Sequence, residues 1–170
     1  MSIVKNQPRY KNSLLQAIRG TLEHRAMWLA LLVEEAEKKG LKPEEYAGAA
    51  IKKCGCIQGK ELVDKTKGKT SLKGLKKNLF TIPAQFVFEM KILESTDDNL
   101  SIDFHYCPLV AAWQKMGLSD EKIAQLCDIA MDGDRGIASQ YGCKLNLGKV
   151  ISKGEDICQI RFERTEPIIK

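Results

Sequence analysis

The chain has 170 residues, of which 44% are hydrophobic and 29% are charged, and its net charge is +5. This length and composition suit one compact domain with its own core and exclude a disordered, low-complexity protein. The polar start, MSIVKNQPRYKNS, is unlike a signal peptide, and the longest apolar stretch, AMWLALLV, is too short to span a bilayer. We therefore expect a cytoplasmic protein that does not insert into a membrane.

The first predicted element is a long amphipathic helix over residues 12–39. Its apolar residues recur at spacings of three and four, Asn12 or Ser13 can cap its start, and Gly40 follows its last turn. A second helix is predicted to open at Pro43 and to run as far as the sequence CGC. An exposed apolar surface on the first helix can support a homo-oligomer.

Residues 57–84 are rich in glycine and lysine and lack a clear period, which predicts a long, partly mobile basic connection. Six lysines lie between Lys65 and Lys77. A solvated loop explains this run better than a nucleic-acid site, because arginines and aromatic residues are not interleaved with the lysines. We expect no nucleic-acid partner.

The period changes after residue 84. QFVFEMKIL and LSIDFHYC alternate apolar and polar residues around the turn sequence STDDN, which predicts an antiparallel hairpin. In the second strand, Asp103, His105 and Cys107 are predicted to share one face. Pro108 ends that strand and begins a helix, Ser119 caps another helix, and CKLNLG and DICQIRFER supply two more strands.

These elements predict an α+β fold, in which N-terminal helices pack on a mostly antiparallel sheet with a helical insertion between strands. We expect a single domain over residues 1–170. It would comprise a helical part (1–56), the basic connection (57–84) and a sheet-and-helix part (85–170) that carries the site.

Cys107 is the first candidate site residue. It is predicted to lie where a strand gives way to a helix, and there free N–H groups and the helix dipole lower the pKa of a thiol. His105, two residues earlier on the same predicted face, can share a proton or a metal ion with it. The pair suits nucleophilic catalysis and is equally half of a zinc site, so the sequence leaves the cofactor unknown.

The helix that follows Ser119 supplies a second half of the site. Cys127 and Asp134 lie on one helical face, and the glycines on either side of Asp134 are predicted to bend the helix and free its carboxylate. Arg135 can hold a substrate carboxylate in two parallel hydrogen bonds, although an ordinary ion pair with Asp132 explains it as well. Cys127 can equally be a small core residue.

The remaining cysteines carry weaker signals. Cys158 alternates with apolar residues on its predicted strand, which favours packing. Cys54 and Cys56 are separated by one residue, a tighter spacing than zinc knuckles use, so the end of a helix is the preferred interpretation. No glycine-rich nucleotide loop, serine nucleophile elbow or HExxH motif occurs in the sequence.

The run HYCPLVAAWQKMGLSDEKIAQLCDIAMDGDRG resembles the bacterial L-2-amino-thiazoline-4-carboxylic acid hydrolase (ATC hydrolase) family. The residues that carry this resemblance are Cys107 with Pro108, the WQKMGL turn, Cys127, and Asp134 seven residues later. KGEDIC, which ends in Cys158, resembles the family's glycine–acid–cysteine signature. The resemblance covers roughly residues 100–162.

The resemblance implies hydrolysis of a five-membered cyclic amidine, giving N-carbamoyl-L-cysteine, and hence a hydrolase of carbon–nitrogen bonds with a small-molecule substrate. We hypothesise that Cys107, or water near it, attacks the amidine carbon while His105 carries the proton. Asp134 would hydrogen-bond the amidinium and Arg135 would bind the substrate carboxylate. The resemblance also makes Cys127 and Cys158 site residues.

Two alternatives stay open at this point. A metal-binding or small-ligand-binding domain without catalysis would use His105, Cys107, Cys127 and Cys158 as ligands, with zinc as one candidate metal. A weaker alternative is a nucleic-acid-binding protein that uses the Lys65–Lys77 run.

Overall fold

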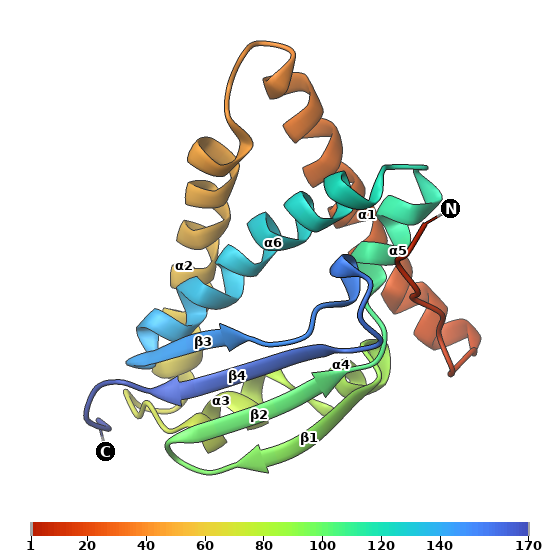
Figure 1. Cartoon of the computed structure of the whole chain (residues 1–170). Helices are drawn as coiled ribbons and strands as arrows, with labels where there is room; N and C mark the ends of the chain where they lie inside the picture. The colour runs from red at the N-terminus through yellow and green to blue at the C-terminus, as the bar shows by residue number, and fades with distance from the viewer. Residues whose placement is uncertain (1, 170) are drawn as a thin grey trace.

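The computed structural model describes residues 2–169, which form six α-helices, two short helical segments and a four-stranded sheet (Figure 1). The elements in chain order are α1 (Ser13–Glu37), the π-helix η1 (Glu44–Gly48), α2 (Ala49–Lys65), α3 (Leu72–Leu79), α4 (Ile82–Val87), β1 (Met90–Ser95), β2 (Asn99–Phe104), α5 (Pro108–Lys115), α6 (Asp120–Gln140), β3 (Cys143–Leu147), the 3-10 helix η2 (Ile151–Lys153) and β4 (Cys158–Arg164).

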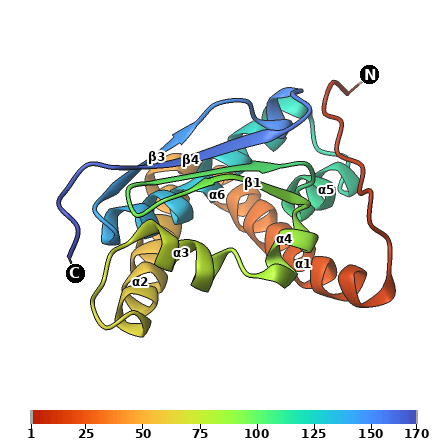
Figure 2. The ribbon, with the colours of Figure 1, turned by 90° about the horizontal axis from the view of Figure 1, so that it is seen from below.

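The strands form one antiparallel sheet in the order β1-β2-β4-β3. Helices α1 to α4 lie on one side of this sheet (Figure 2). The inner face of the two central strands is buried, and it consists of Leu100, Ile102, Cys158, Ile160 and Phe162. On the outer face, Arg161 Nη2 pairs with Asp103 Oδ1 at 2.7 Å. This one-sided antiparallel sheet with helical cover confirms the α+β class and the predicted hairpin.

The first helix begins and ends as its sequence predicts. The Asn12 side chain accepts a hydrogen bond from the Leu15 N–H at 2.8 Å, and Gly40 beyond the last turn has a left-handed φ of 77°. Ser119 caps α6 in the same way, since its hydroxyl accepts from the Lys122 N–H at 3.2 Å. No helix within residues 2–169 combines the length and the apolar character needed to cross a membrane.

The predicted basic connection over residues 57–84 is wrong. Helix α2 continues to Lys65, and α3 and α4 fill most of the remaining segment. The signal that was missed is the pair Leu72 and Leu75, which are three residues apart and fully buried while Lys73 and Lys77 stay in solvent. Two apolar residues are hard to recognise as a helical pattern in a window so rich in lysine, yet two well-placed leucines suffice to dock a short helix on a core.

The strand predicted to begin at residue 85 is also displaced. Residues up to Val87 are helical, with a proline in the first turn of α4, and β1 starts only at Met90. Glu89 connects the two elements in a left-handed conformation, with φ of 51°. Val87 is therefore buried and Phe86 is 51% exposed, the opposite of the alternation expected from a strand.

Helices α2 and α6 cross at glycine residues. The glycines on either side of Asp134 take part in this crossing, and the predicted helix bend around Asp134 is wrong. Helix α6 runs without interruption to Gln140, and its glycines serve close packing. A Cβ atom on Gly55 would lie 1.9 Å from the carbonyl oxygen of Gly133, and one on Gly136 would lie 2.3 Å from the carbonyl oxygen of Lys52. The CGC sequence is likewise in the middle of α2, where its glycine is required by the neighbouring helix.

This crossing predicts opposite effects for two glycine-to-alanine substitutions. Gly55→Ala should lower the free energy of unfolding by about 1–3 kcal/mol, because the added methyl group forces two backbones apart. Gly20→Ala in α1 meets nothing within 4 Å and should raise the free energy of unfolding by about 0.5–1 kcal/mol. Urea denaturation of both variants checks this pair, and equal effects would contradict the close crossing.

Candidate functional site

The junction between β2 and α5 positions Cys107. Strand β2 ends at Phe104, and Cys107 is the N-cap residue of α5, with extended backbone angles. The buried Asn6 holds this backbone from the other side, since its side chain accepts from the Cys107 N–H at 2.9 Å and donates to the Cys107 carbonyl at 2.8 Å. The N-terminal segment thereby fixes the start of α5.

Four of the candidate residues come together from three elements. Cys107 lies within electrostatic range of Cys127 and Asp134 of α6, and Cys158 of β4 lies within range of Cys107 and Cys127, so that charge on one of these groups raises the pKa of its neighbours. The Cys158 sulfur also accepts a hydrogen bond from the Ile151 N–H at 3.2 Å. We name these four residues the cysteine–aspartate cluster.

The predicted low pKa of Cys107 is wrong for the protein without a ligand. The N–H groups of Val110 and Leu109 do lower it, as a helix N-terminus should. Burial outweighs them, however, and together with the nearby Cys127 it raises the pKa of Cys107 to about 12. Burial also raises the pKa of Cys127 and of Cys158. All three groups are therefore neutral thiols at pH 7.

Asp134 is the titratable group of the cluster near neutral pH. Burial raises its pKa from 3.8 to about 6, and the opposing influence comes first from Arg25 of α1. Asp134 as a whole residue is half-buried. A carboxylate with this pKa can accept and return a proton near neutrality.

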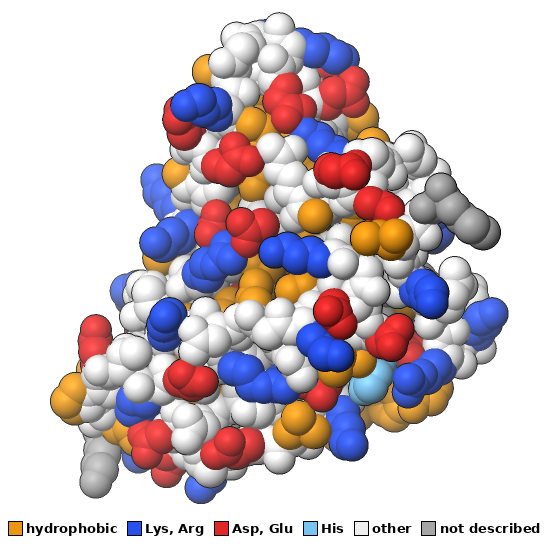
Figure 3. All heavy atoms as spheres, in the orientation of Figure 1, with side chains coloured by type: hydrophobic (Ala, Val, Ile, Leu, Met, Phe, Trp, Pro, Cys, Tyr) orange, Lys and Arg blue, Asp and Glu red, His pale blue; other side chains and the backbone are white. Residues whose placement is uncertain are grey.

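Helix α6, which carries Cys127 and Asp134, borders a depression on the surface (Figure 3). Figure 3 shows hydrophobic side chains at the bottom of a depression between α6 and the β3–β4 connection, with acidic and basic side chains around it. The Ser152 hydroxyl in that connection is 1% exposed and has no hydrogen-bond partner, although it lies near enough to lower the pKa of Cys127. A buried hydroxyl without a close partner beside the Cys127 thiol marks a place where a ligand can supply a hydrogen bond.

His105 does not belong to this cluster, so the predicted Cys107–His105 pair is wrong. The His105 N–H donates to the Glu89 carbonyl at 3.2 Å, and its ring Nδ1 lies 3.4 Å from Nη2 of Arg9. The ring lines a different pocket, near β1. The reason is that β2 stops at Phe104, so the alternation of side chains between two faces does not continue to Cys107.

Arg135 is also engaged elsewhere. Its guanidinium donates to Asp128 Oδ1 at 2.6 Å and to Asp132 Oδ1 at 2.8 Å, which is the ion-pair alternative offered by the sequence. The charge of Arg25 lowers the pKa of Asp134 more than that of Arg135 does, and none of the ion pairs within residues 2–169 includes Arg25. The sequence offered no signal for Arg25, because α1 and α6 are far apart in the chain and only the tertiary structure brings its charge within range of Asp134.

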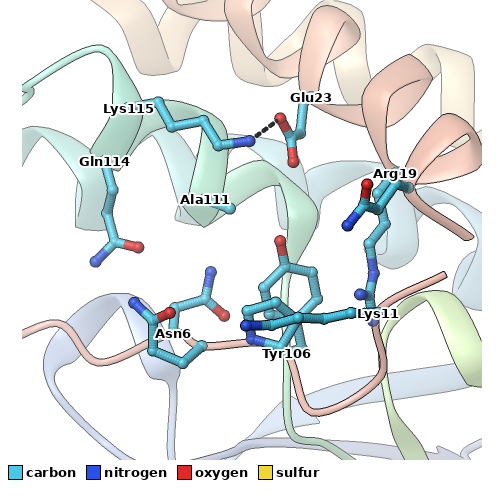
Figure 4. A pocket seen from close by; sticks show the side chains of 11 residues that line it. Asn6, Lys11, Arg19, Glu23, Tyr106, Ala111, Gln114 and Lys115 are labelled. Atoms are coloured by element: carbon cyan, nitrogen blue, oxygen red, sulfur yellow. Dashed lines mark hydrogen bonds and ion pairs between the residues drawn. The ribbon is translucent and has the colours of Figure 1, made fainter. Parts of the chain in front are cut away.

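A larger pocket of about 650 Å³ lies on the other side of the β2–α5 junction, between the N-terminal segment, α1 and α5. Figure 4 shows the Tyr106 hydroxyl directed toward Glu23, which pairs with Lys115 across the pocket. Arg19 packs over the Tyr106 ring, 4.3 Å from its centre. This pocket is polar and contains no residue of the cysteine–aspartate cluster.

Within residues 2–169, no three His, Cys, Asp or Glu side chains are arranged to hold a metal ion. The predicted metal-ligand set of His105, Cys107, Cys127 and Cys158 is excluded, because the His105 ring lines a different pocket from the three cysteines. The six cysteines are all free thiols.

The fold and the cluster define a class: an α+β protein with neutral thiols and one buried, titratable carboxyl group. A family model described as L-2-amino-thiazoline-4-carboxylic acid hydrolase matches residues 19–162. The chain belongs to this family, and the family name is that of a hydrolase.

Two further comparisons complete this result. No curated protein matches the sequence. Among solved structures, the chain is similar to a trafficking protein particle complex subunit 3 from Naegleria fowleri, covalently bound to palmitic acid, with 17% identity and a TM-score of 0.55. That match covers 87% of this chain and 97% of the other, and at such low identity it establishes a shared fold alone.

Proposed function

We propose that the protein hydrolyses a small cyclic amidine carboxylate, L-2-amino-thiazoline-4-carboxylate or a close relative, at the cysteine–aspartate cluster. The observation that carries this proposal is the convergence of Cys107, Cys127, Cys158 and Asp134 from three elements. These residues also carry the resemblance to the hydrolase family. Such a cluster combines a nucleophile with a carboxylate whose pKa is about 6.

The first step needs an ionised Cys107, and the substrate itself can supply the missing charge. A protonated amidine is a cation, and its position between Asp134 and Cys107 favours loss of the thiol proton. The sulfur then attacks C2 of the ring, which two nitrogens and a sulfur make electrophilic. Asp134 takes the thiol proton and passes it to the departing ring sulfur.

The second step consumes one water. Its oxygen attacks the same carbon, Asp134 takes a proton from it, and the bond to Cys107 breaks as the thiol is restored. Both nitrogens remain on the carbon in N-carbamoyl-L-cysteine, so the ring bond that opens for this product is the carbon–sulfur bond. The carbon–nitrogen cleavage expected from the sequence applies only to relatives without a ring sulfur.

Arg25 replaces Arg135 in this scheme as the partner of the substrate carboxylate. Its charge on α1 is the largest one that lowers the pKa of Asp134, and a guanidinium binds a carboxylate through two parallel hydrogen bonds. The carboxylate would then lie toward α1 and the amidinium toward Asp134. Ser152 is in a position to donate to a ring atom, which would satisfy its hydroxyl.

The test is turnover of L-2-amino-thiazoline-4-carboxylate, followed by release of a free thiol and of a ureido product. Cys107→Ser should lower kcat/KM by about 10³-fold or more, because serine keeps the shape without the reactivity of sulfur. Cys54→Ser is the matched control, since Cys54 is an exposed cysteine on α2. Absence of thiol release by the unmodified protein, or equal activity of the two variants, would refute the proposal.

A second candidate function is binding of a small ligand at the three thiols without catalysis. Burial of neutral sulfurs favours it, because such thiols react slowly until a ligand ionises them. Intact mass of the purified protein separates the two. An acyl adduct on Cys107, such as the palmitate named for the trafficking subunit, would replace the hydrolytic mechanism.

A further inference from the structure

The pocket of about 650 Å³ beside the β2–α5 junction has no part in the proposed reaction, because it contains no residue of the cysteine–aspartate cluster. The N-terminal segment, α1 and α5 form its walls, with Tyr106 between them (Figure 4). Four of the side chains that line it are carboxamides, those of Asn6, Gln7, Gln16 and Gln114. Polar groups that converge in a concave site fix the orientation of a small molecule.

Tyr106 is the group in this pocket that lacks a partner. The residue is 4% exposed, and its ring packs against the guanidinium of Arg19. Its hydroxyl is directed into the pocket toward Glu23 and makes no hydrogen bond within residues 2–169 (Figure 4). Unlike the enclosed hydroxyl of Tyr141, it keeps surface that a ligand can reach. A hydrogen-bonding group on a buried side chain that faces a cavity without a partner indicates the position of a ligand.

Most charges in the lining cancel in pairs. Arg19 pairs with Glu89 at 3.1 Å, and Lys115 pairs with Glu23 across the pocket. Lys11 is exposed, belongs to none of the ion pairs within residues 2–169 and directs its amino group into the pocket (Figure 4). One free cation favours a ligand with a single negative charge over a dianion such as a phosphate monoester.

The uncharged groups of the lining offer both donors and acceptors. Gln114 donates through Nε2 to the Val4 carbonyl at 2.9 Å, which leaves its side-chain oxygen free to accept. Gln7 and Gln16 are exposed, and each contributes an amide donor and an amide acceptor. Burial, and then the charge on Glu23, raise the pKa of Tyr106 to about 12, so its hydroxyl is a neutral donor at pH 7. Ligand hydroxyls, which donate and accept, complement such a lining, whereas an apolar ligand would leave these groups unsatisfied.

We propose that this pocket binds a small sugar acid, a polyhydroxylated molecule of hexose size with one carboxylate. Lys11 pairs with the carboxylate, and the ligand hydroxyls bond to the Tyr106 hydroxyl and to the side-chain oxygen of Gln114. A volume of about 650 Å³ holds one such molecule together with water. This site does not depend on the proposed hydrolysis.

Isothermal titration calorimetry of the full chain with glucuronate tests the proposal. Glucose and acetate are the comparison probes, because glucose lacks the carboxylate and acetate lacks the hydroxyls. We expect saturable binding of glucuronate, and binding of glucose and of acetate that is weaker by about threefold or more. A hexose phosphate carries a second negative charge and should bind no more tightly than glucuronate.

Two pairs of variants locate the site. Tyr106→Phe removes only the hydroxyl and should weaken glucuronate binding about three- to tenfold, with no loss of stability, because that hydroxyl has no partner in the free protein. Tyr10→Phe is its matched control, since Tyr10 is half-exposed and lies outside this pocket. Lys11→Gln should weaken binding about threefold or more. Lys5→Gln removes the same charge from the same segment outside the pocket and should leave the affinity unchanged.

Four results would overturn the proposal: no saturable binding of glucuronate, equal binding of glucuronate and either comparison probe, tighter binding of the hexose phosphate, or equal affinities of each pocket variant and its control. Asp134→Asn should stop the proposed hydrolysis and leave glucuronate binding unchanged. The two sites can therefore succeed or fail separately in the same preparation.

Discussion

Replacing Asp134 with asparagine should nearly abolish turnover of a cyclic amidine while making the folded protein more stable above about pH 6. The loss of rate follows because an amide cannot take the proton of the Cys107 thiol or return it to the leaving sulfur. We expect kcat to fall about 10²- to 10⁴-fold, the usual contribution of a general acid–base group. The acidic limb of the pH–rate profile near pH 6 should disappear with it.

Stability should rise although activity falls, because burial in the folded state disfavours the charged form of the Asp134 carboxyl group. The pKa of Asp134 is raised from 3.8 to about 6, so the protonated form is favoured in the folded state. The contribution of Asp134 protonation to the free energy of unfolding is fully present below about pH 3.8. It is lost as the pH rises toward 6 and is absent above that. Asp134→Asn should therefore gain about 1–3 kcal/mol over the parent protein at pH 7, and nothing at pH 3.5.

Urea denaturation at pH 3.5, 5 and 7, together with initial rates, measures both effects. Asp128→Asn is the matched control on the same helix, because Asp128 is exposed and pairs with Arg135. Its effect on stability should stay within about 1 kcal/mol, and its rate should be unchanged. A variant of Asp134 that loses stability at pH 7, or keeps full activity, would show that this carboxylate serves the structure alone.

The second large expected effect concerns Arg19 of α1. This charged residue is buried, whereas an amphipathic helix ordinarily keeps its charged residues in solvent. Its guanidinium is 4% exposed, pairs with Glu89, and donates to the carbonyls of Val87, Phe86 and Tyr10. Arg19→Met should lower the free energy of unfolding by about 3–5 kcal/mol, since it leaves a buried carboxylate without its counter-ion. The measurement is equilibrium denaturation at pH 7.

A second substitution, at Glu89, separates the effect of the unpaired carboxylate charge from the effect of the altered side-chain shape at position 19. In the Arg19→Met background, Glu89→Gln should recover part of the loss, because the amide oxygen can keep the N–H groups of Arg9 and Tyr10 without a net charge. Lys38→Met breaks an exposed pair with Glu34 and should cost less than about 1 kcal/mol. If Arg19→Met costs no more than Lys38→Met, the pair does not stabilise the junction of α4 and β1.

Much of the fold follows from local patterns. The caps at Asn12 and Ser119, the proline that starts α5 and the alternation of β2 and β4 all act within a few residues, so they predicted α1, the hairpin, α5, α6 and the last strands. The helices in residues 57–84 were missed because their lysines mask a small number of buried leucines. The start of β1 was missed because the left-handed Glu89 is stabilised by distant partners.

The candidate site likewise has features that local sequence predicts and features that depend on tertiary contacts. The sequence by itself determined the family signature and the order of its residues, including Cys107 at a helix start and Cys127 and Asp134 on one helical face. Tertiary structure alone decided that Cys107 lies within electrostatic range of Cys158 while His105 contacts Arg9 and Glu89. It also decided that the charge of Arg25 affects the Asp134 carboxylate more than that of Arg135, which pairs with Asp128. It also decided the protonation states. Helix dipoles can be anticipated from local sequence, whereas desolvation depends on every chain segment that surrounds the group, and here it raises the pKa of the thiol to about 12.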